Sequence, residues 1–217
     1  MKFRMSLVGM MVGVALCGTA MGFGLPSMGG GSSKSTGDPD AYLKKSQTSE
    51  NLVNKSADLL FLLVASKEAQ AKAEELQKKV AATTDPKEQK ALLQQKHDSA
   101  LAEISKAAAS KDLEAQAKSW DDKKKAQGKA ALFNLALGSK MAAELVPEGQ
   151  DLAKSIKSNP MLVTKLGSIT DAVKSMGGVI SGSSKVLTAL PSVFKAAKID
   201  VVLPQSATDK PQPMADI

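Results

Sequence analysis

The feature that most constrains this chain is a long stretch without a helix breaker. No Gly or Pro occurs between residues 40 and 85, and the stretch is rich in Ala, Leu, Lys, Glu and Gln. These residues favour helices, whereas Gly and Pro interrupt them. Apolar residues recur there at steps of three and four, as one buried helix face requires. They are Leu52, Val53, Ala57, Leu60, Leu63 and Val64. The sequence therefore predicts one long helix over about 39–82.

Two Asp-Pro pairs mark helix starts, because Asp caps the first turn and Pro is tolerated at its first position. They are Asp38-Pro39 and Asp85-Pro86. The inner face of the second helix is predicted to carry Leu93, His97, Leu101, Ile104 and Ala108. Two alternatives stay open after it. Either the chain turns near 109–112 with Ser110 as a cap, or 87–146 is one continuous helix. In both, Pro147 is expected to end the helical stretch 111–146, which carries Leu113, Ala117, Trp120, Leu132, Leu135 and Leu145.

The last third of the chain shows a helical pattern broken by glycines. Asn159-Pro160 is expected to start a helix, and its apolar stripe is Leu162, Leu166, Ile169, Val173, Met176 and Ile180. Gly177, Gly178 and Gly182 are expected to interrupt that helix, either as a hinge or where two helices cross closely. The pattern resumes at Leu187, Leu190, Phe194 and Ile199, with a kink expected at Pro191.

Charge is unevenly distributed along the chain. Residues 67–125 hold 13 Lys and 11 acidic side chains with the two signs interleaved, whereas 51–66 and 126–203 are more apolar. Interleaved charges are typical of solvated helices that pair within one chain or between chains. The predicted fold over 38–203 is all-α: an elongated up-down bundle of about four helices with a charged antiparallel hairpin arm. The run 59–64 is apolar on all sides and is expected to be buried. From residue 204 to 217, three prolines among polar residues predict a disordered tail.

The first twenty residues have the composition of an export signal. Lys2 and Arg4 precede an uncharged apolar run that is too short to span a bilayer. Small residues follow, so that cleavage after Ala20 or after Gly22 satisfies a signal peptidase; the alternative is an uncleaved anchor. Residues 21–37 have linker composition, rich in Gly and Ser. We expect a bacterial protein that is periplasmic or secreted.

Cys17 is the only cysteine and lies at the end of the apolar run. It is either discarded with the signal or lipidated, in which case the protein is tethered to a membrane. Lipidation signals usually carry a small residue before the cysteine, and here that residue is Leu16. In either case no thiol is left in the helical part for a disulfide or for thiolate metal binding.

The residues that most enzymes need are scarce, so we expect no catalytic site and no cofactor. His97 is the single histidine and has helical spacing to Leu93 and Leu101, which favours a half-buried position on a helix face over a catalytic base. One histidine without thiols does not make a typical zinc or transition-metal site. The pair Ser192 and Lys195 has Ser-x-x-Lys spacing, but the companion motifs of penicillin-recognising enzymes are absent from the chain.

Composition also limits the partners. The formal net charge is +7, and removal of Lys2 and Arg4 with the signal leaves +5. Arg4 is the only arginine and aromatic residues are few, which argues against nucleic-acid recognition. The expected partner is another protein or a membrane surface. We therefore expect a protein-binding or chaperone-like module of the cell envelope, or alternatively a lipid-associated protein or accessory subunit of an envelope assembly. An oligomer is compatible with the charged stripe of 67–125.

Overall fold

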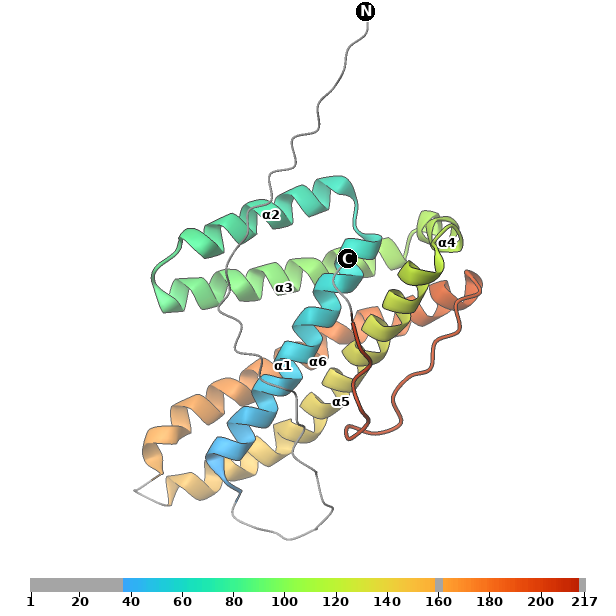
Figure 1. Cartoon of the computed structure of the whole chain (residues 1–217). Helices are drawn as coiled ribbons and strands as arrows, with labels where there is room; N and C mark the ends of the chain where they lie inside the picture. Colours follow the sequence, from blue (N-terminus) through green and yellow to red (C-terminus); the bar gives the residue numbers. More distant parts are fainter. Residues whose placement is uncertain (1–36, 159–161, 215–217) are drawn as a thin grey trace, which may run out of the picture. The chain divides into compact units, whose positions relative to one another are not determined.

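The computed structural model describes residues 37–158 and 162–214, and within them every regular element is helical (Figure 1). The helices are α1 (Pro39–Val64), α2 (Lys67–Ala82), α3 (Pro86–Ala108), α4 (Lys111–Lys118), α5 (Asp122–Lys157) and α6 (Leu166–Ala196), with a short 3₁₀ turn, η1 (Val163–Lys165), before α6. The predicted all-α bundle is confirmed. It is built from six helices in the described part of the chain, where about four were expected.

Helix starts follow the capping chemistry of the sequence. The side chains of Asp38, Asp85 and Ser110 each accept a hydrogen bond from a backbone amide in the first turn of α1, α3 and α4. Of the two alternatives after α3, the turn with Ser110 as a cap is therefore the one adopted. Ser66 and Asp121 cap α2 and α5 in the same way, and neither cap was predicted from the sequence. A side-chain cap contributes about 1 kcal/mol to helix stability.

Two predicted helix boundaries were wrong. The helix expected over 39–82 breaks at Ala65, because extended backbone there lets Ser66 cap a new helix and separates the apolar end of α1 from the charged α2. Conversely, Pro147 does not end a helix: α5 continues to Lys157. Pro147 removes the amide that would bond the carbonyl of Ala143, and both residues are exposed, so water can satisfy that carbonyl.

The predicted interruption of the last helix was also wrong, since α6 runs unbroken past its glycines and Pro191. A Cβ added at Gly182 would lie 2.7 Å from Leu101 Cδ1 of α3, so this glycine allows the close helix crossing that was one of the two alternatives. Gly177 and Gly178 face open space. Whether any of the three acts as a hinge stays a prediction, and the expected start at Asn159-Pro160 falls outside the described residues.

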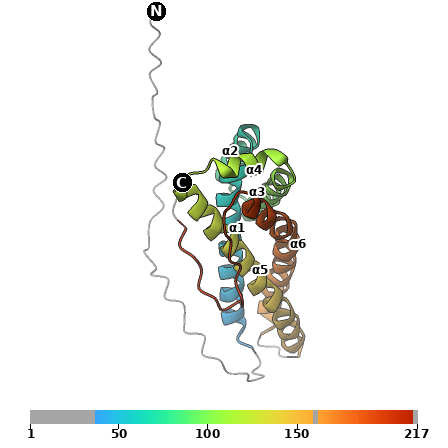
Figure 2. The same ribbon diagram turned by 90° about the vertical axis from the view of Figure 1, so that its right-hand side faces the viewer.

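The body of the fold is formed by α1, α5 and α6, with α3 packed against α1 and α6 (Figures 1 and 2). Buried residues recur on α1 and α5 at alternating steps of four and three, the seven-residue repeat of packed helices. On α1 they are Tyr42, Ser46, Ser49, Val53, Ser56, Leu60 and Leu63. On α5 they are Ala131, Leu135, Gly138, Ala142, Leu145, Gly149, Leu152 and Ile156. Small residues on both helices let the two backbones approach each other.

Helices α1 and α5 approach each other closely at Gly138. The Ser49 hydroxyl donates to the Gly138 carbonyl at 2.8 Å, which satisfies a buried polar group across the interface. A Cβ at Gly138 would lie 2.5 Å from Val53 Cγ2 and 3.2 Å from the Ser49 carbonyl oxygen. The glycine is therefore required by packing, and it fixes the register of the antiparallel pair.

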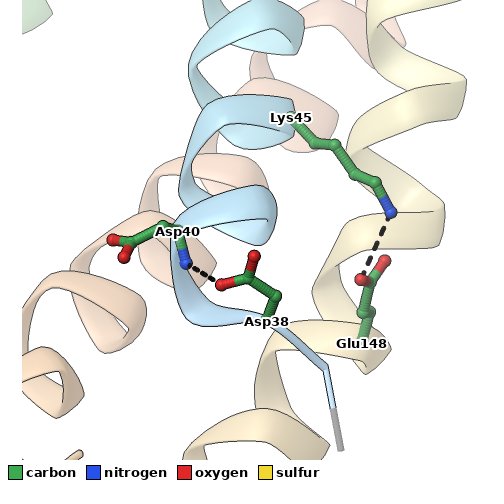
Figure 3. Close-up of polar contacts among 4 residues, drawn as sticks. All are labelled: Asp38, Asp40, Lys45 and Glu148. Carbon is green, nitrogen blue, oxygen red and sulfur yellow. Dashed lines mark hydrogen bonds and ion pairs between the residues drawn. The ribbon is translucent and has the colours of Figure 1, made fainter. Parts of the chain in front are cut away.

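The end of the body where α1 begins is held by exposed polar contacts (Figure 3). The Asp40 amide donates to the Asp38 carboxylate at 3.0 Å, which is the N-cap of α1. Lys45 pairs with Glu148 of α5 at 3.4 Å, and Lys165 of η1 pairs with Asp40 at 2.6 Å. Exposed pairs of this kind each contribute less than about 1 kcal/mol, so the apolar interface supplies most of the stability here.

Burial matches most of the predicted core, with two exceptions. Within the apolar run 59–64, five residues are buried, but Leu62 is 52% exposed. On α3, Leu101, Ile104 and Ala108 are buried as expected, whereas Leu93 is 47% exposed, so its place on an inner face was wrong. Leu62 follows Asn51, Lys55 and Asp58 at helical spacing on the less buried face of α1, and Leu93 precedes the buried residues of α3, which begin at Ala100. Helical spacing places residues on one face but does not say where that face ceases to be covered.

The C-terminal segment returns along the body (Figure 1). It was expected to be disordered from residue 204. The structure instead gives residues 204–214 defined contacts, in which the Asn134 side chain of α5 exchanges two hydrogen bonds with Gln212 and Lys140 donates to the Gln205 carbonyl. The composition of the segment does not predict these contacts, because the groups that hold it belong to α1 and α5.

Candidate functional site

The clearest candidate site is a groove formed by α2, α3 and the end of α1, which we call the hairpin groove. Figure 1 shows α2 and α3 as an antiparallel pair joined at residues 83–85. Of the sixteen residues of α2, only Val80 is buried. The half-buried Ala69, Ala73 and Leu76 precede Val80 at helical spacing, so this narrow stripe is the face that α2 turns to the groove and to α3.

The hairpin groove encloses about 500 Å³ and combines an apolar floor with a charged rim. The floor includes Phe61, Ala69, Ala73, Leu76 and Ala100. The rim carries both signs, with Glu68, Lys72, Glu75 and Lys79 from α2 and Lys96, Glu103 and Lys106 from α3. An apolar floor between rows of mixed charge is how helices recognise another helix or an extended peptide.

Polar contacts join the hairpin to α1 beside the hairpin groove. Lys96 of α3 pairs with Asp58 of α1 at 3.2 Å, and both line the groove. The side-chain amide of Gln70 donates to the Ala65 carbonyl at 3.1 Å, which satisfies an acceptor at the end of α1. The junction between the hairpin and the body is thus defined, whereas α2 beyond it contacts mainly α3.

His97 lies on α3 in the half-buried position that the sequence predicted. Its Nε2 atom is buried and has no hydrogen-bond partner in the structure. Burial lowers the pKa of His97, and Lys96 acts in the same direction, while Asp98, Asp58 and Glu50 raise it. His97 does not line the hairpin groove. The imidazole belongs to the packing between α3 and the body.

Ser192 and Lys195 do not form a nucleophile pair in this structure. The Ser192 hydroxyl donates to the Ala189 carbonyl of its own helix at 2.7 Å. Both Ser192 and Lys195 are exposed on α6. A hydroxyl that bonds back to its own helix is the ordinary arrangement of an exposed helical serine. Cys17, the predicted lipidation residue, lies outside the described residues.

A second, smaller groove was not predicted from the sequence. It encloses about 280 Å³ between α5, α6 and the C-terminal segment. Its lining is Ala136, Ser139, Lys140, Ala143, Ile180, Leu187 and Leu203. Leu203 is 39% exposed and its neighbour Val202 is 70% exposed. No sequence signal marks this groove, because it depends on where the C-terminal segment returns.

Within residues 37–158 and 162–214, no cluster of three or more His, Cys, Asp or Glu side chains could hold a metal ion. None of the helices in the same part of the chain is long and apolar enough to cross a membrane. Comparison with models of protein families, with curated proteins and with solved structures gave no match.

Proposed function

We propose that this chain is an exported, non-enzymatic helical protein of the cell envelope that binds another protein through the α2–α3 hairpin, used as a charged arm. The observation that carries the proposal is the exposure of α2. A sixteen-residue helix with one buried residue contributes little to the core, yet it forms one wall of the hairpin groove. The partner that fits is a helix or peptide with apolar residues on one face and charges of both signs beside them.

Site-specific photocrosslinking in cells that produce the protein tests this proposal. A benzophenone amino acid is placed at Lys72 or Lys79, which line the groove, and at Gln77 as the matched control, which is exposed on α2 but does not line the groove. We expect a discrete crosslinked partner from the two groove positions and none from Gln77. The same pattern from all three positions, or no crosslink from any, contradicts the proposal.

Charge reversal distinguishes specific binding of a partner from nonspecific electrostatic attraction. For this comparison the benzophenone amino acid is placed at Glu75, an exposed residue that also lines the groove. The double variant Lys72→Glu with Lys79→Glu alters the rim, whereas Lys87→Glu with Lys90→Glu makes the same change in charge on exposed residues of α3 outside the groove. We expect the first pair to reduce the crosslink about tenfold and the second to leave it nearly unchanged, because complementary charges raise the association rate of the correct pair. Equal losses would indicate nonspecific attraction.

A chaperone-like role is the form of this proposal in which many unfolded clients share the groove. It predicts that the purified protein suppresses aggregation of an unfolded outer-membrane protein. The Lys72→Glu, Lys79→Glu variant should then lose suppression, and the Lys87→Glu, Lys90→Glu variant should keep it. If neither variant changes the suppression of aggregation, the hairpin groove does not bind the unfolded clients.

A second candidate is a lipid- or membrane-associated protein, or a tethered accessory subunit of an envelope assembly. The exposed Val202 and Leu203 beside the second groove favour it. The intact mass of the protein from separated periplasmic and membrane fractions distinguishes the candidates. A soluble species that begins near Met21 or Phe23 supports the protein-binding proposal. A membrane-bound species that begins at an acylated Cys17, and that floats with liposomes, supports the second candidate.

A further inference from the structure

Asn134 is an unusual residue for its place in α5. It is completely buried, and the residues around it in the helix, from Ala130 to Leu137, are all apolar and buried. A buried side-chain amide that lacks hydrogen bonds costs several kcal/mol. Its partners come from the C-terminal segment. The Asn134 amide donates to the Gln212 carbonyl at 2.7 Å, and its oxygen accepts from the Gln212 N–H at 2.8 Å.

These two hydrogen bonds reproduce the pairing of a β-strand. In an antiparallel ladder, one residue gives its N–H and its carbonyl to one residue opposite. Helix backbone cannot offer this, because its own amides and carbonyls are already paired. The side-chain amide of Asn134 supplies the missing donor and acceptor. The helix therefore recognises the main chain of an extended segment at one residue.

The sequence of the segment suits recognition through the main chain. Gln212 lies between Pro211 and Pro213, which have no N–H, so Gln212 carries the only amide of the three. The prolines also restrict the backbone and reduce the entropy lost on docking. Gln212 itself is exposed, and its two hydrogen bonds with Asn134 are made by its backbone. The site therefore recognises the backbone of residue 212 and not its side chain.

Two further contacts orient the segment along α1 and α5 (Figures 1 and 2). Met214 packs against the core, with its sulfur 3.8 Å from the Ser56 hydroxyl of α1. At the other end, Lys140 donates to the Gln205 carbonyl at 3.3 Å. Between them, the Asp209 carboxylate accepts from the Gln205 amide at 2.7 Å and closes a turn. Residues 210–213 are exposed, so few side-chain contacts hold them.

We propose that the surface around Asn134 and Ser56 is a binding site for an extended, proline-flanked segment of a partner protein, and that residues 210–214 occupy it as an internal stand-in. A covalently attached segment competes at an effective concentration in the millimolar range, so few contacts suffice to seat it. A partner segment with the same Pro-X-Pro backbone and an apolar residue after it displaces it. This site is separate from the hairpin groove and does not depend on the function proposed for it.

The test uses the full chain with Gln212→Pro, which removes the one amide that pairs with Asn134 and opens the site. The probe is a fluorescein-labelled peptide of residues 203–214, measured by fluorescence polarisation at peptide and protein concentrations up to about 1 mM. Two matched peptides carry Gln212→Ala, which keeps the amide, and Gln212→Pro, which lacks it. Circular dichroism checks that the protein variant keeps its helices.

We expect the Gln212→Pro protein to bind the native and Gln212→Ala peptides within about twofold of each other, and the Gln212→Pro peptide at least about tenfold more weakly. Adding Asn134→Leu to the protein should cost about the same factor. The wild-type chain should bind the native peptide more weakly than the Gln212→Pro chain, because its own segment competes.

Disulfide capture gives a second readout that detects weak binding. In a Cys17→Ser, Ser56→Cys, Gln212→Pro chain, the new thiol is the only one, and it should trap the probe peptide with Met214→Cys. The peptide that also carries Gln212→Pro should be trapped at least about tenfold more slowly. Equal trapping of the two, or no binding in either assay by a folded variant, overturns the proposal. A wild-type dimer that Gln212→Pro dissociates assigns the site to a second copy of the chain and also overturns it.

Discussion

The body and the hairpin are both helical, but they are stabilised in different ways. In the body, α1 and α5 bury residues at alternating steps of four and three along their whole lengths. The two backbones approach each other closely at Ser49 and Gly138. In the hairpin, α2 buries only Val80. Tertiary packing supplies most of the stability of helices in proteins, so the free energy of local opening should be much smaller for α2 than for α5. The comparison predicts where substitutions matter.

The largest expected difference is between two leucine-to-alanine substitutions. Leu135 of α5 is fully buried, whereas Leu76 of α2 is half-buried at the edge of the hairpin groove. Leu135→Ala should lower the free energy of unfolding by about 2–5 kcal/mol, because it leaves a cavity in a packed core. Leu76→Ala should lower it by less than about 1.5 kcal/mol, because the site is partly solvated. Urea unfolding followed by circular dichroism measures both, and losses of equal size would mean that α2 is part of the main core.

Two glycine-to-alanine substitutions test the same comparison, with smaller expected changes in the free energy of unfolding. At Gly138, a new Cβ would meet Val53 and the carbonyl oxygen of Ser49, so one of the two helices must move. Gly138→Ala should therefore destabilise the protein by about 1–3 kcal/mol.

Gly177 is the matched control, because a Cβ there meets nothing within 4 Å and the residue is inside α6. Gly177→Ala should stabilise by about 0.5–1 kcal/mol, since alanine loses less backbone entropy in a helix. Thermal unfolding of the two variants should shift in opposite directions. A loss of stability in both would show that Gly177 has a conformational role, as a hinge would.

Local chemistry explains how much of the fold was predictable. Asp38-Pro39, Asp85-Pro86 and Ser110 start helices where the sequence places them, because capping depends on neighbouring residues only. The break at Ser66 and the continuation through Pro147 were not predicted. Each depends on what surrounds the helix: a core that the charged α2 does not enter, and solvent that satisfies the carbonyl left unpaired by a proline.

The candidate sites show the same limit. The charge pattern of 67–125 pointed to the hairpin, but not to the groove between its helices, which also needs Phe61 and Asp58 from α1. Asn134 could have been noticed as the one amide within an apolar stretch of α5. Its partner Gln212 lies 78 residues away in a segment with the composition of a disordered tail. A contact between residues so far apart leaves no periodic signal in either one.

The smallest expected effect is on the pH dependence of the free energy of unfolding, and it comes from His97, where the hairpin joins the body. Burial lowers the pKa of His97 in the folded protein below its usual value near 6.5, and Lys96 adds to this, against the opposing influence of Asp98, Asp58 and Glu50. The unfolded chain therefore binds a proton at a higher pH than the folded chain does. As the pH falls below about 6.5, the free energy of unfolding should decrease; above that value the contribution of His97 is fully present.

Because His97 is the only histidine, His97→Gln should remove this dependence between about pH 8 and 5, above the range in which carboxylates titrate. Urea unfolding at several pH values measures it. A slope that persists in His97→Gln, or that is absent from the wild type, would mean that the imidazole is as solvated in the folded protein as in the unfolded chain, and that α3 is less tightly docked on the body than its contacts with α1 indicate.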